Sequence, residues 1–551
     1  MSAVFDVVAS SNGKSSRTTA KQTLGEKFAS RQSNELVIAF AGPIGCGIHS
    51  VIDEAASLLT ARGYVDVVRV KLSEFIQQAI NDKTIVLPKS ASDPPSSPRF
   101  KRYRQLQDAG KALRKGTGNR AILAEYAVKK IVVDRRERAD EMRQPGALDD
   151  VVVPKRIAYL IDQVKRPEEV ALLRAVYRNL FYLVGVTRIN DHRVSELGRE
   201  GLRAEEISKL MEIDRFEDKV DGQQMDKTLH LADYFIRNDT STVEDGRKKL
   251  ERALALLHGD QSITPTDDEQ GMYAAYAAGL RSACLSRQVG ASIVSSSGEI
   301  LATGCNDVPK AGGGLYSASS GSNDMRCVHR TEQICFNDFH KRKLQNEIGD
   351  EVDSYLSSLN RGDDAPAFKL SIDEKERLLN QIYDRTRLGS LIEFSRSVHA
   401  EMDAIVSLAR HGGGVRESTL YTTTFPCHSC ARHIVAAGIV QVFYIEPYEK
   451  SMAKDLHDDA IAFEVEAGKV MTGTVSKVKF LHFEGVSPRQ FQNFFRASGR
   501  KGVDGKFIRI QPRTAEKAVP EYLDDYQAFE AKAVEHLGQE LDALKLRPSG
   551  V

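Results

Sequence analysis

The 551-residue sequence has almost no net charge, because 77 basic residues are balanced by 76 acidic ones. It therefore gives no overall electrostatic sign of binding to nucleic acid or to an anionic membrane. It also lacks any stretch approaching 18 apolar residues, so we expect no transmembrane segment. The first 33 residues contain no continuous apolar core of the kind that a secretory signal peptide needs. These absences predict a cytoplasmic protein without membrane contacts.

Cysteine is also scarce. The seven cysteines are an odd number in a long chain without an export signal, which argues against a disulfide framework. We expect reduced thiols and metal ligands instead. The cysteines stand at positions 46, 284, 305, 327, 335, 427 and 430.

The length of the chain predicts two or three domains. A leader over residues 1–33, rich in Ser, Thr, Lys and Gln, is expected to be disordered. Apolar runs then alternate with amphipathic stretches, which is typical of a parallel sheet covered by helices. The strand-like runs lie at 36–40, 64–70, 156–162 and 179–186. The predicted parts are a first domain at 34–258, a linker at 259–270, a second domain at 271–500 with a charged helical insertion at about 318–390, and a C-terminal helical extension at 501–551.

A histidine, a glutamate and two cysteines form the clearest chemical pattern. They occur as His399-Ala-Glu401 and, further on, Pro426-Cys427-His-Ser-Cys430. One imidazole and two thiolates supply three zinc ligands and leave a fourth tetrahedral position for water, whose pKa zinc lowers towards neutrality. The pattern is typical of zinc nucleobase deaminases, in which hydroxide attacks C4 of cytosine while the glutamate carries protons to N3 and to the leaving ammonia.

A structural zinc site is the alternative interpretation of the same residues. Such a site usually has a fourth protein ligand, and it does not need the accompanying Glu401 or Pro426. We therefore interpret His399, Cys427 and Cys430 as ligands of a catalytic zinc ion, with Glu401 as the catalytic residue.

Three stretches around these residues resemble the deoxycytidylate deaminase branch of the cytidine deaminase superfamily. They are CLSRQVGASIVSSSGEILATGCNDVPKAGGG, SVHAEMDAIVSLARHG and TLYTTTFPCHSCARHIVAAGIVQVFYIEPYEKS. The resemblance implies a three-layer α/β/α fold, Zn2+ as cofactor, deoxycytidine nucleotides as substrates and assembly into a homo-oligomer. It also implies that Asn306, in a Gly-x-Asn loop, and Arg287, in a Cys-x-x-Arg segment, contact the substrate.

Each substrate contact has a structural alternative. Asn306 could stabilise its own turn, and Arg287 could be a solvated helix end. Tyr421 precedes the Pro-Cys turn and Tyr448 follows a later strand, so both are candidates for the pocket wall. Packing in the core would explain these two tyrosines equally well.

The chain departs from the family pattern in two places. The family loop runs Gly-Tyr-Asn-Gly, whereas here Asp307 follows Asn306, and its carboxylate could repel a substrate phosphate or hold Mg2+ beside it. The second departure is the segment inserted before His399, which contains four potential zinc ligands. They could form a second, structural metal site, or the thiols could simply pack. These candidates are Cys327, His329, Cys335 and His340.

A glycine-rich turn follows the first strand-like run in the sequence AFAGPIGCGIHS. Its spacing matches a phosphate-binding loop, but the expected Lys and Ser or Thr are replaced by Ile48 and His49. Without the lysine and the magnesium-binding hydroxyl, phosphoryl transfer is disfavoured, while the loop amides could still hold a phosphate. The candidate nucleotide-binding residues are Gly42, Gly45, Gly47, His49 and Ser50.

The first domain resembles P-loop nucleoside monophosphate kinases in the stretches at 104–131, 156–186 and 231–239. A degenerate domain of this type fused to a deoxycytidylate deaminase resembles the bacterial anti-phage deoxycytidylate deaminases. This resemblance implies deamination of dCTP and dCMP during phage infection, a regulatory nucleotide at the front domain and, for some members, inhibition by a small RNA.

Four other functions remain open from the sequence. A housekeeping dCMP deaminase would share the same zinc site. A nucleic-acid cytidine deaminase would need a groove for flanking nucleotides, usually with a basic path, which the balanced charge does not favour. A regulatory RNA-binding protein would not need Glu401, and a bifunctional kinase–deaminase is disfavoured by Ile48.

Overall fold

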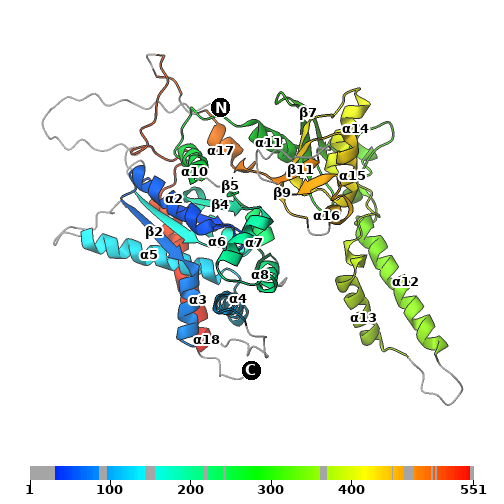
Figure 1. The fold of residues 1–551 in the computed structure, drawn as a ribbon, viewed down its shortest axis with the longest axis horizontal. Coiled ribbons are helices and arrows are strands. Elements are labelled where there is room, and N and C mark those ends of the chain that lie inside the picture. Colours follow the sequence, from blue (N-terminus) through cyan, green and yellow to red (C-terminus); the bar gives the residue numbers. More distant parts are fainter. Residues whose placement is uncertain are drawn as a thin grey trace.

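The structure of the protein is a computed structural model with two α/β domains and a projecting helical arm (Figure 1). The ranges that it describes are 31–85, 96–142, 156–215, 221–239, 243–359, 369–448, 451–463, 477–497, 500–502 and 505–545. The predicted leader therefore lies almost entirely outside the described residues. Its final residue, Ser33, is buried, because its hydroxyl lies 2.9 Å from that of Tyr526 and its amide donates to the carbonyl of Glu521.

The first domain contains the parallel sheet that the apolar runs predict. The strand order is β2-β3-β1-β4-β5, all parallel, and the short antiparallel β12 completes the edge beside β5. All six residues of β1 are buried, as expected for a central strand covered on both faces. The strands are β1 (Leu36–Ala41), β2 (Asp66–Lys71), β3 (Ile157–Asp162), β4 (Phe181–Thr187), β5 (Tyr234–Arg237) and β12 (Gly485–Val486).

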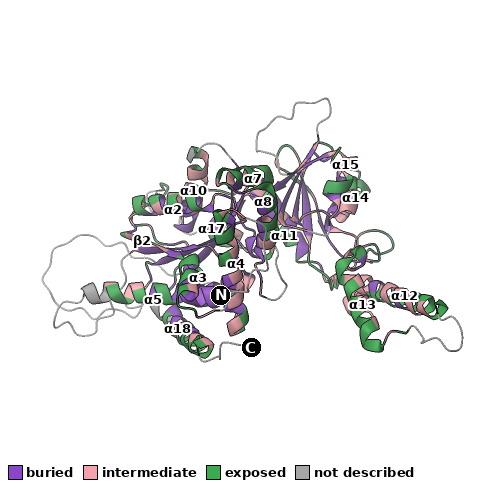
Figure 2. Ribbon diagram, turned by 60° about the horizontal axis from the view of Figure 1, so that its bottom comes forward, coloured by how far each residue is buried: buried purple, intermediate pink, exposed green. Residues whose placement is uncertain are grey.

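Helices cover both faces of this sheet because successive residues of each strand point to opposite sides. One face packs against α2 and α10, and the other against α3, α5 and α6. Figure 2 shows the buried strands between the more exposed helices. The helices of this domain are α2 (Ile48–Ala61), α3 (Leu72–Asn81), α4 (Pro98–Thr117), α5 (Ile122–Met142), α6 (Pro167–Tyr177), η1 (Arg178–Leu180), α7 (Asn190–Arg199), α8 (Ala204–Arg215), α9 (Met225–Leu229) and α10 (Val243–Leu257).

The second domain contains a mixed sheet with helices on both faces, as the family resemblance implies. Its order is β10-β11-β9-β8-β6-β7, in which β6 is antiparallel to both its neighbours and the remaining pairs are parallel. Helix α11 lies against one face, and α14 and α15 pack on the other. The elements are α11 (Asp267–Gly279), β6 (Gly290–Val294), β7 (Ile300–Cys305), α14 (Ala400–Arg410), β8 (Thr419–Thr424), α15 (His428–Ala437), β9 (Gln441–Glu446), α16 (Ala453–Leu456), β10 (Ile461–Phe463) and β11 (Val478–His482).

The predicted insertion forms the arm at the lower right of Figure 1, where two helices lie side by side. Its elements are η2 (Ala318–Asn323), η3 (Cys327–His329), α12 (Phe336–Ser358), α13 (Ile372–Arg385) and η4 (Arg387–Ser390). The long helices of the arm are largely exposed (Figure 2). Across the described ranges, no helix combines the length and the apolar composition required to cross a bilayer.

After β11 the chain returns to the first domain. The ring of Phe483 contacts that of Phe235, β12 pairs with β5, and the C-terminal helix α18 packs on α5. The structure therefore moves the domain boundary from the predicted residue 500 to about residue 483, because the last strand of the mixed sheet has ended there. The two terminal helices are α17 (Phe491–Phe495) and α18 (Leu523–Lys545), and the second matches the predicted C-terminal helix.

A buried ion cluster joins α18 to the first strand. The guanidinium of Arg135, on α5, donates to the carboxylate of Glu35 at 2.7 and 2.8 Å and to that of Glu530 at 2.6 and 2.9 Å. The side chains of Glu35 and Glu530 are 0% and 3% exposed, so this single cation balances two buried carboxylates. The hydroxyl of Tyr526 also donates to Glu35.

We expect Arg135→Leu to lower the midpoint of thermal unfolding by about 10 °C, because removing one partner of a buried ion pair costs about 3–5 kcal/mol. Arg199→Leu is the matched control, since Arg199 is 72% exposed and its pair with Glu196 is solvated. Differential scanning calorimetry of both variants measures the two shifts. Equal midpoints for the two variants would contradict the importance of the cluster.

Candidate active site

Three potential metal ligands converge at the N-termini of two helices. His399 is the N-cap residue of α14, Cys427 is that of α15, and Cys430 lies in the first turn of α15. The Nδ1 atom of His399 lies 3.2 Å from the sulfur of Cys427 and 3.4 Å from that of Cys430. All three ligand atoms lie within 4.8 Å of one another.

This arrangement fits a zinc ion. Tetrahedral zinc with bonds of about 2.0–2.3 Å places neighbouring ligand atoms roughly 3.6 Å apart, close to the separations observed here. Hydrogen bonds from Cys430 and His399 lower the pKa of Cys427, which favours the thiolate that binds metal. One nitrogen and two sulfur ligands leave one position of a tetrahedron without a protein ligand, as in catalytic zinc sites.

Glu401 lies in the first turn of α14, two residues beyond the histidine cap, and is 4% exposed. Burial raises the pKa of its carboxyl group, and the nearby Cys427 raises it further. A carboxyl group with a raised pKa can hold a proton near neutral pH and release it to a bound ligand. This is the behaviour required of a proton carrier beside the metal ligands.

His399, Cys427 and Glu401 line one pocket with a volume of about 250 Å³, and Cys430 is buried beside them. The mixed sheet supplies Thr424 to its wall, and the 284–289 segment supplies another side. The inserted segment also reaches the pocket, through the start of α12 and the stretch just before His399. The contributions from that segment are Cys327, Cys335, Phe336, Asn337, Asp338, Lys341, Leu391, Ile392, Ser395, Arg396 and Ser397.

Two of the predicted substrate residues, Arg287 and Tyr448, line this pocket. The guanidinium of Arg287 lies 3.0 Å from the carboxylate of Glu446 and 5.5 Å from the centre of the Tyr448 ring. The side chain of Arg287 is 46% exposed and therefore accessible to a ligand. Burial raises the pKa of Tyr448 to about 12, so its hydroxyl stays protonated and can donate a hydrogen bond.

Asn306 also lines the pocket, but its side chain supports the pocket wall. Its Nδ2 donates to the carbonyl of Arg287 at 2.8 Å, and its Oδ1 accepts from the amide of Val289 at 2.7 Å. The structure therefore shows contacts for the alternative role of Asn306, which is to stabilise the local backbone. One amide hydrogen of Nδ2 remains for a ligand.

Tyr421 does not line the pocket, so the prediction for this residue is wrong. Its hydroxyl donates to Asp268 at 2.6 Å, and its ring stacks on Phe443 in the core between the two domains. Alternate residues of a strand face opposite sides of a sheet. Leu420 and Thr424 therefore face the metal side, and Tyr421 faces α11.

The four residues of the predicted second metal site do not converge. Of the described residues, only two groups of three or more potential ligands lie close together, and neither contains Cys327, His329, Cys335 or His340. His340 packs among the rings of Phe336, Phe339 and Phe394. These four side chains therefore do not form a metal site in the structure.

Asp307 is 2% exposed and does not face the pocket. Its carboxylate accepts hydrogen bonds from the amides of Ala283 and Val308, at 2.9 and 2.8 Å. These bonds direct the carboxylate to the backbone outside the pocket lining, so the structure gives no support to a phosphate-linked magnesium ion at Asp307.

The glycine-rich turn joins β1 to α2 at the carboxyl edge of the central strand. Gly45 and Gly47 have φ angles of 80° and 72°, which favour glycine, and a Cβ at Gly42 would lie 2.7 Å from the carbonyl oxygen of Val186. Ser50 donates to the carbonyl of Gly47, and the Nδ1 of His49 lies 3.2 Å from Asp162. Ser50 and His49 thus bind protein groups around the turn. Nucleotide binding at the turn stays a prediction.

Lys341 and Arg396 were not predicted as site residues, although both line the pocket. Arg396 stands three residues before His399, so its proximity to the motif was the available signal. Lys341 lies in the first turns of α12, and no sequence pattern connects this helix with the metal ligands. Only the fold brings the inserted helix over the pocket.

Comparison with known proteins places the similarity in the second domain. Residues 265–446 match the family model described as the cytidine and deoxycytidylate deaminase zinc-binding region. The deoxycytidylate deaminase of Enterobacteria phage T2 is 41% identical over 54 residues, which are 10% of this chain and 29% of that protein. ComE operon protein 2 of Bacillus subtilis is 36% identical over 67 residues, which are 12% of this chain and 35% of that protein. The chain thus spans about a third of the length of these relatives.

Among solved structures, the dCMP deaminase of cyanophage S-TIM5 in its apo form is 19% identical, with a TM-score of 0.18. The alignment covers 34% of this chain and 89% of that chain. So low a TM-score carries no argument. The similarity thus rests on the family model, which places a deaminase zinc-binding region in residues 265–446, and on the short sequence matches to deoxycytidylate deaminases.

Proposed function

We propose that the protein catalyses zinc-dependent hydrolytic deamination of free deoxycytidine nucleotides, converting dCMP or dCTP into dUMP or dUTP and ammonia. The observation that carries this proposal is the convergence of His399, Cys427 and Cys430 at a pocket that His399, Cys427 and Glu401 line, within the range that matches the deaminase family model. When bound by the three ligands, zinc would lower the pKa of a water molecule towards neutrality.

Glu401 is the residue proposed to move protons in this reaction. Burial raises the pKa of its carboxyl group, which favours the protonated form, so it can protonate N3 of the cytosine ring, take up a proton from the attacking water and transfer that proton to the departing ammonia. His399 and the two cysteines hold their positions through the helix N-termini on which they lie. This arrangement keeps the proton carrier and the metal ligands on one side of the pocket.

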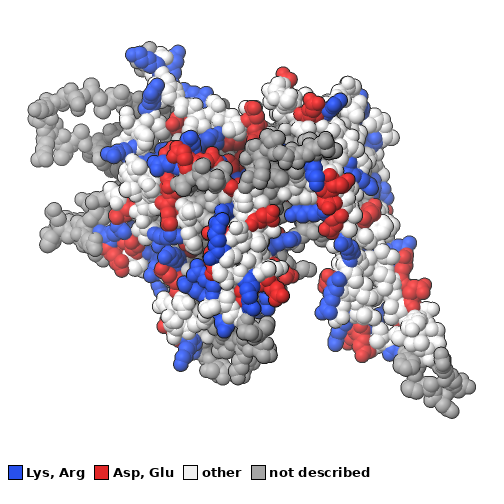
Figure 3. Space-filling view, viewed as in Figure 1, with Lys and Arg blue, Asp and Glu red and all other residues white. Residues whose placement is uncertain are grey.

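Three cationic side chains in the pocket favour the proposal that the substrate carries a phosphate. Arg287, Lys341 and Arg396 all line the pocket and can balance the negative charge of a phosphate. The inserted segment covers part of the pocket, which favours a free nucleotide over a strand that would need an open path for its neighbours. On the face drawn in Figure 3, basic and acidic side chains are interspersed over both domains, in keeping with the balanced composition.

The first domain, which begins at residue 34, is proposed to be a P-loop-like regulatory domain without kinase activity. Support comes from the parallel sheet, the glycine-rich turn after its central strand, and Ile48 in place of the catalytic lysine. The biological role that the sequence resemblance implies is depletion of the deoxycytidine nucleotide pool in anti-phage defence. A housekeeping role in dUMP synthesis is the alternative, and both share the same chemistry.

Purified protein loaded with zinc should release ammonia from dCMP or dCTP when it is tested in parallel with CMP, CTP and single-stranded DNA. The partly covered pocket and its cations are the physical reason for expecting the free deoxynucleotides to be the substrates. Chromatographic detection of the uracil product provides the measurement. Deamination of DNA alone would refute the proposal.

Glu401→Gln should lower kcat by at least about 1000-fold while the zinc content stays near that of the unchanged protein, because the amide cannot transfer protons but keeps the shape of the side chain. Metal analysis and steady-state kinetics measure the two quantities. Glu417→Gln is the control, since the side chain of Glu417 is 74% exposed and does not line the pocket. A kcat within tenfold of the unchanged protein would contradict the role of Glu401.

The front domain should bind ATP or another nucleotide without hydrolysing it, because Ile48 cannot neutralise the β- and γ-phosphates. Equilibrium binding of a fluorescent nucleotide and a phosphate-release assay test the two parts of this expectation. Efficient phosphoryl transfer to a deoxynucleoside monophosphate would overturn it.

A further inference from the structure

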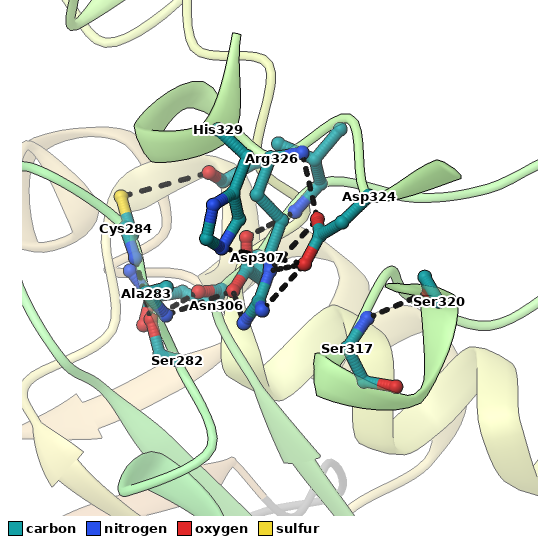
Figure 4. Close-up of polar contacts among 12 residues, drawn as sticks. Ser282, Ala283, Cys284, Asn306, Asp307, Ser317, Ser320, Asp324, Arg326 and His329 are labelled. Carbon is teal, nitrogen blue, oxygen red and sulfur yellow. Dashed lines mark hydrogen bonds and ion pairs between the residues drawn. The ribbon is translucent and has the colours of Figure 1, made fainter. Parts of the chain in front are cut away.

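The inserted segment is attached to the substrate pocket by a buried ion network. Arg326, just before η3, donates from Nε and Nη2 to the carboxylate of Asp324 at 2.6–3.0 Å. Its Nη1 atom lies 3.6 Å from the carboxylate of Asp307 in the second domain. The three side chains are 2–8% exposed, and Figure 4 shows them meeting beside the 282–284 segment.

Asp307 in turn connects two parts of the site. Its carboxylate accepts the amide of Ala283, at the start of the segment that carries Arg287. Its backbone carbonyl accepts the amide of Val398 at 3.0 Å, one residue before the metal ligand His399. A displacement of Asp307 would therefore move both the pocket wall and the chain leading into α14.

The neighbouring residue extends the same wall. The hydroxyl of Ser282 donates to the backbone carbonyl of Asn306 at 2.6 Å, and the side chain of Asn306 bonds to the backbone at Arg287 and Val289. The 282–289 segment is thus held by Asn306 and Asp307 together. Removing Arg326 would leave this buried carboxylate without its ion-pair partner, which is strongly unfavourable.

We propose that Arg326 is a positioning residue that neutralises Asp307 and thereby fixes the 282–289 wall of the substrate pocket. The inserted segment is then an integral part of the active site and not an independent arm. This inference rests on the proposed deaminase function for its kinetic consequences, but the structural consequence, loss of order in the 282–289 segment, is independent of activity.

The kinetic test uses the full-length, zinc-loaded protein with dCMP and dCTP. We expect Arg326→Gln to lower kcat/KM by about tenfold or more, mainly through a higher KM, because small displacements of positioning groups are costly while α14 still holds His399 and Glu401. Zinc content should not change. Lys343→Gln is the matched control, because it removes a charge from the same inserted segment at a site that is 63% exposed.

Asp307→Asn provides the second arm, because it removes the charge that Arg326 balances. If Arg326 acts through Asp307, adding Arg326→Gln to Asp307→Asn should change kcat/KM by less than about twofold. If the two substitutions instead lower kcat/KM independently, so that their factors multiply in the double variant, the proposal is overturned. So would a kcat/KM of the Arg326→Gln variant within twofold of the unchanged protein.

Amide hydrogen exchange distinguishes failure of this inference from failure of the proposed function. In Arg326→Gln, the amides of Ala283 and Val289 should exchange at least about tenfold faster, whereas those of α5 should not change. If no form of the protein deaminates nucleotides, the deaminase proposal fails and the exchange result alone decides the role of Arg326. Unchanged exchange at 283–289 would refute that role whatever the activity.

Discussion

The close packing of helix α14 on strand β7 is the constraint on which the candidate site depends. A Cβ atom at Gly304 would lie 2.2 Å from the carbonyl oxygen of Ala400, so any larger residue would push the helix away from the sheet. His399 caps this helix and Glu401 lies in its first turn, so both take their positions from this contact. Strand β8 leads into α15 beside them, which brings the two cysteines to the same point.

A second constraint is the core shared by the two domains. Helix α11 packs on the mixed sheet, and its Glu269 pairs with Arg252 of the front domain at 2.7 Å and accepts the amide of Val486 in β12. The side chain of Glu269 is 0% exposed, so this charge-assisted contact is part of the buried junction between the domains. It connects the first domain directly to the helix that packs on the mixed sheet.

Much of the architecture could be predicted from local patterns. The apolar runs became β1 to β4 of a parallel sheet, and the motif pattern selected His399, Cys427 and Cys430, which the structure brings together from two helices. Tyr421 shows the limit of this reasoning. Proximity to the Pro-Cys turn favoured the pocket, but the side of the sheet that a strand residue faces depends on the register with its neighbours.

The sequence by itself determined the residues of the candidate site: a histidine, a glutamate and two cysteines in the spacing that is typical of zinc nucleobase deaminases. Only the tertiary structure decided what surrounds them. It directed Asn306 to the backbone, separated the four candidate ligands of a second metal, and brought Lys341, Arg396 and Arg326 from the inserted segment to the pocket or its support. The physical reason is that motif residues are fixed by short-range helix and strand geometry, whereas contacts across the insertion depend on packing between segments distant in the chain.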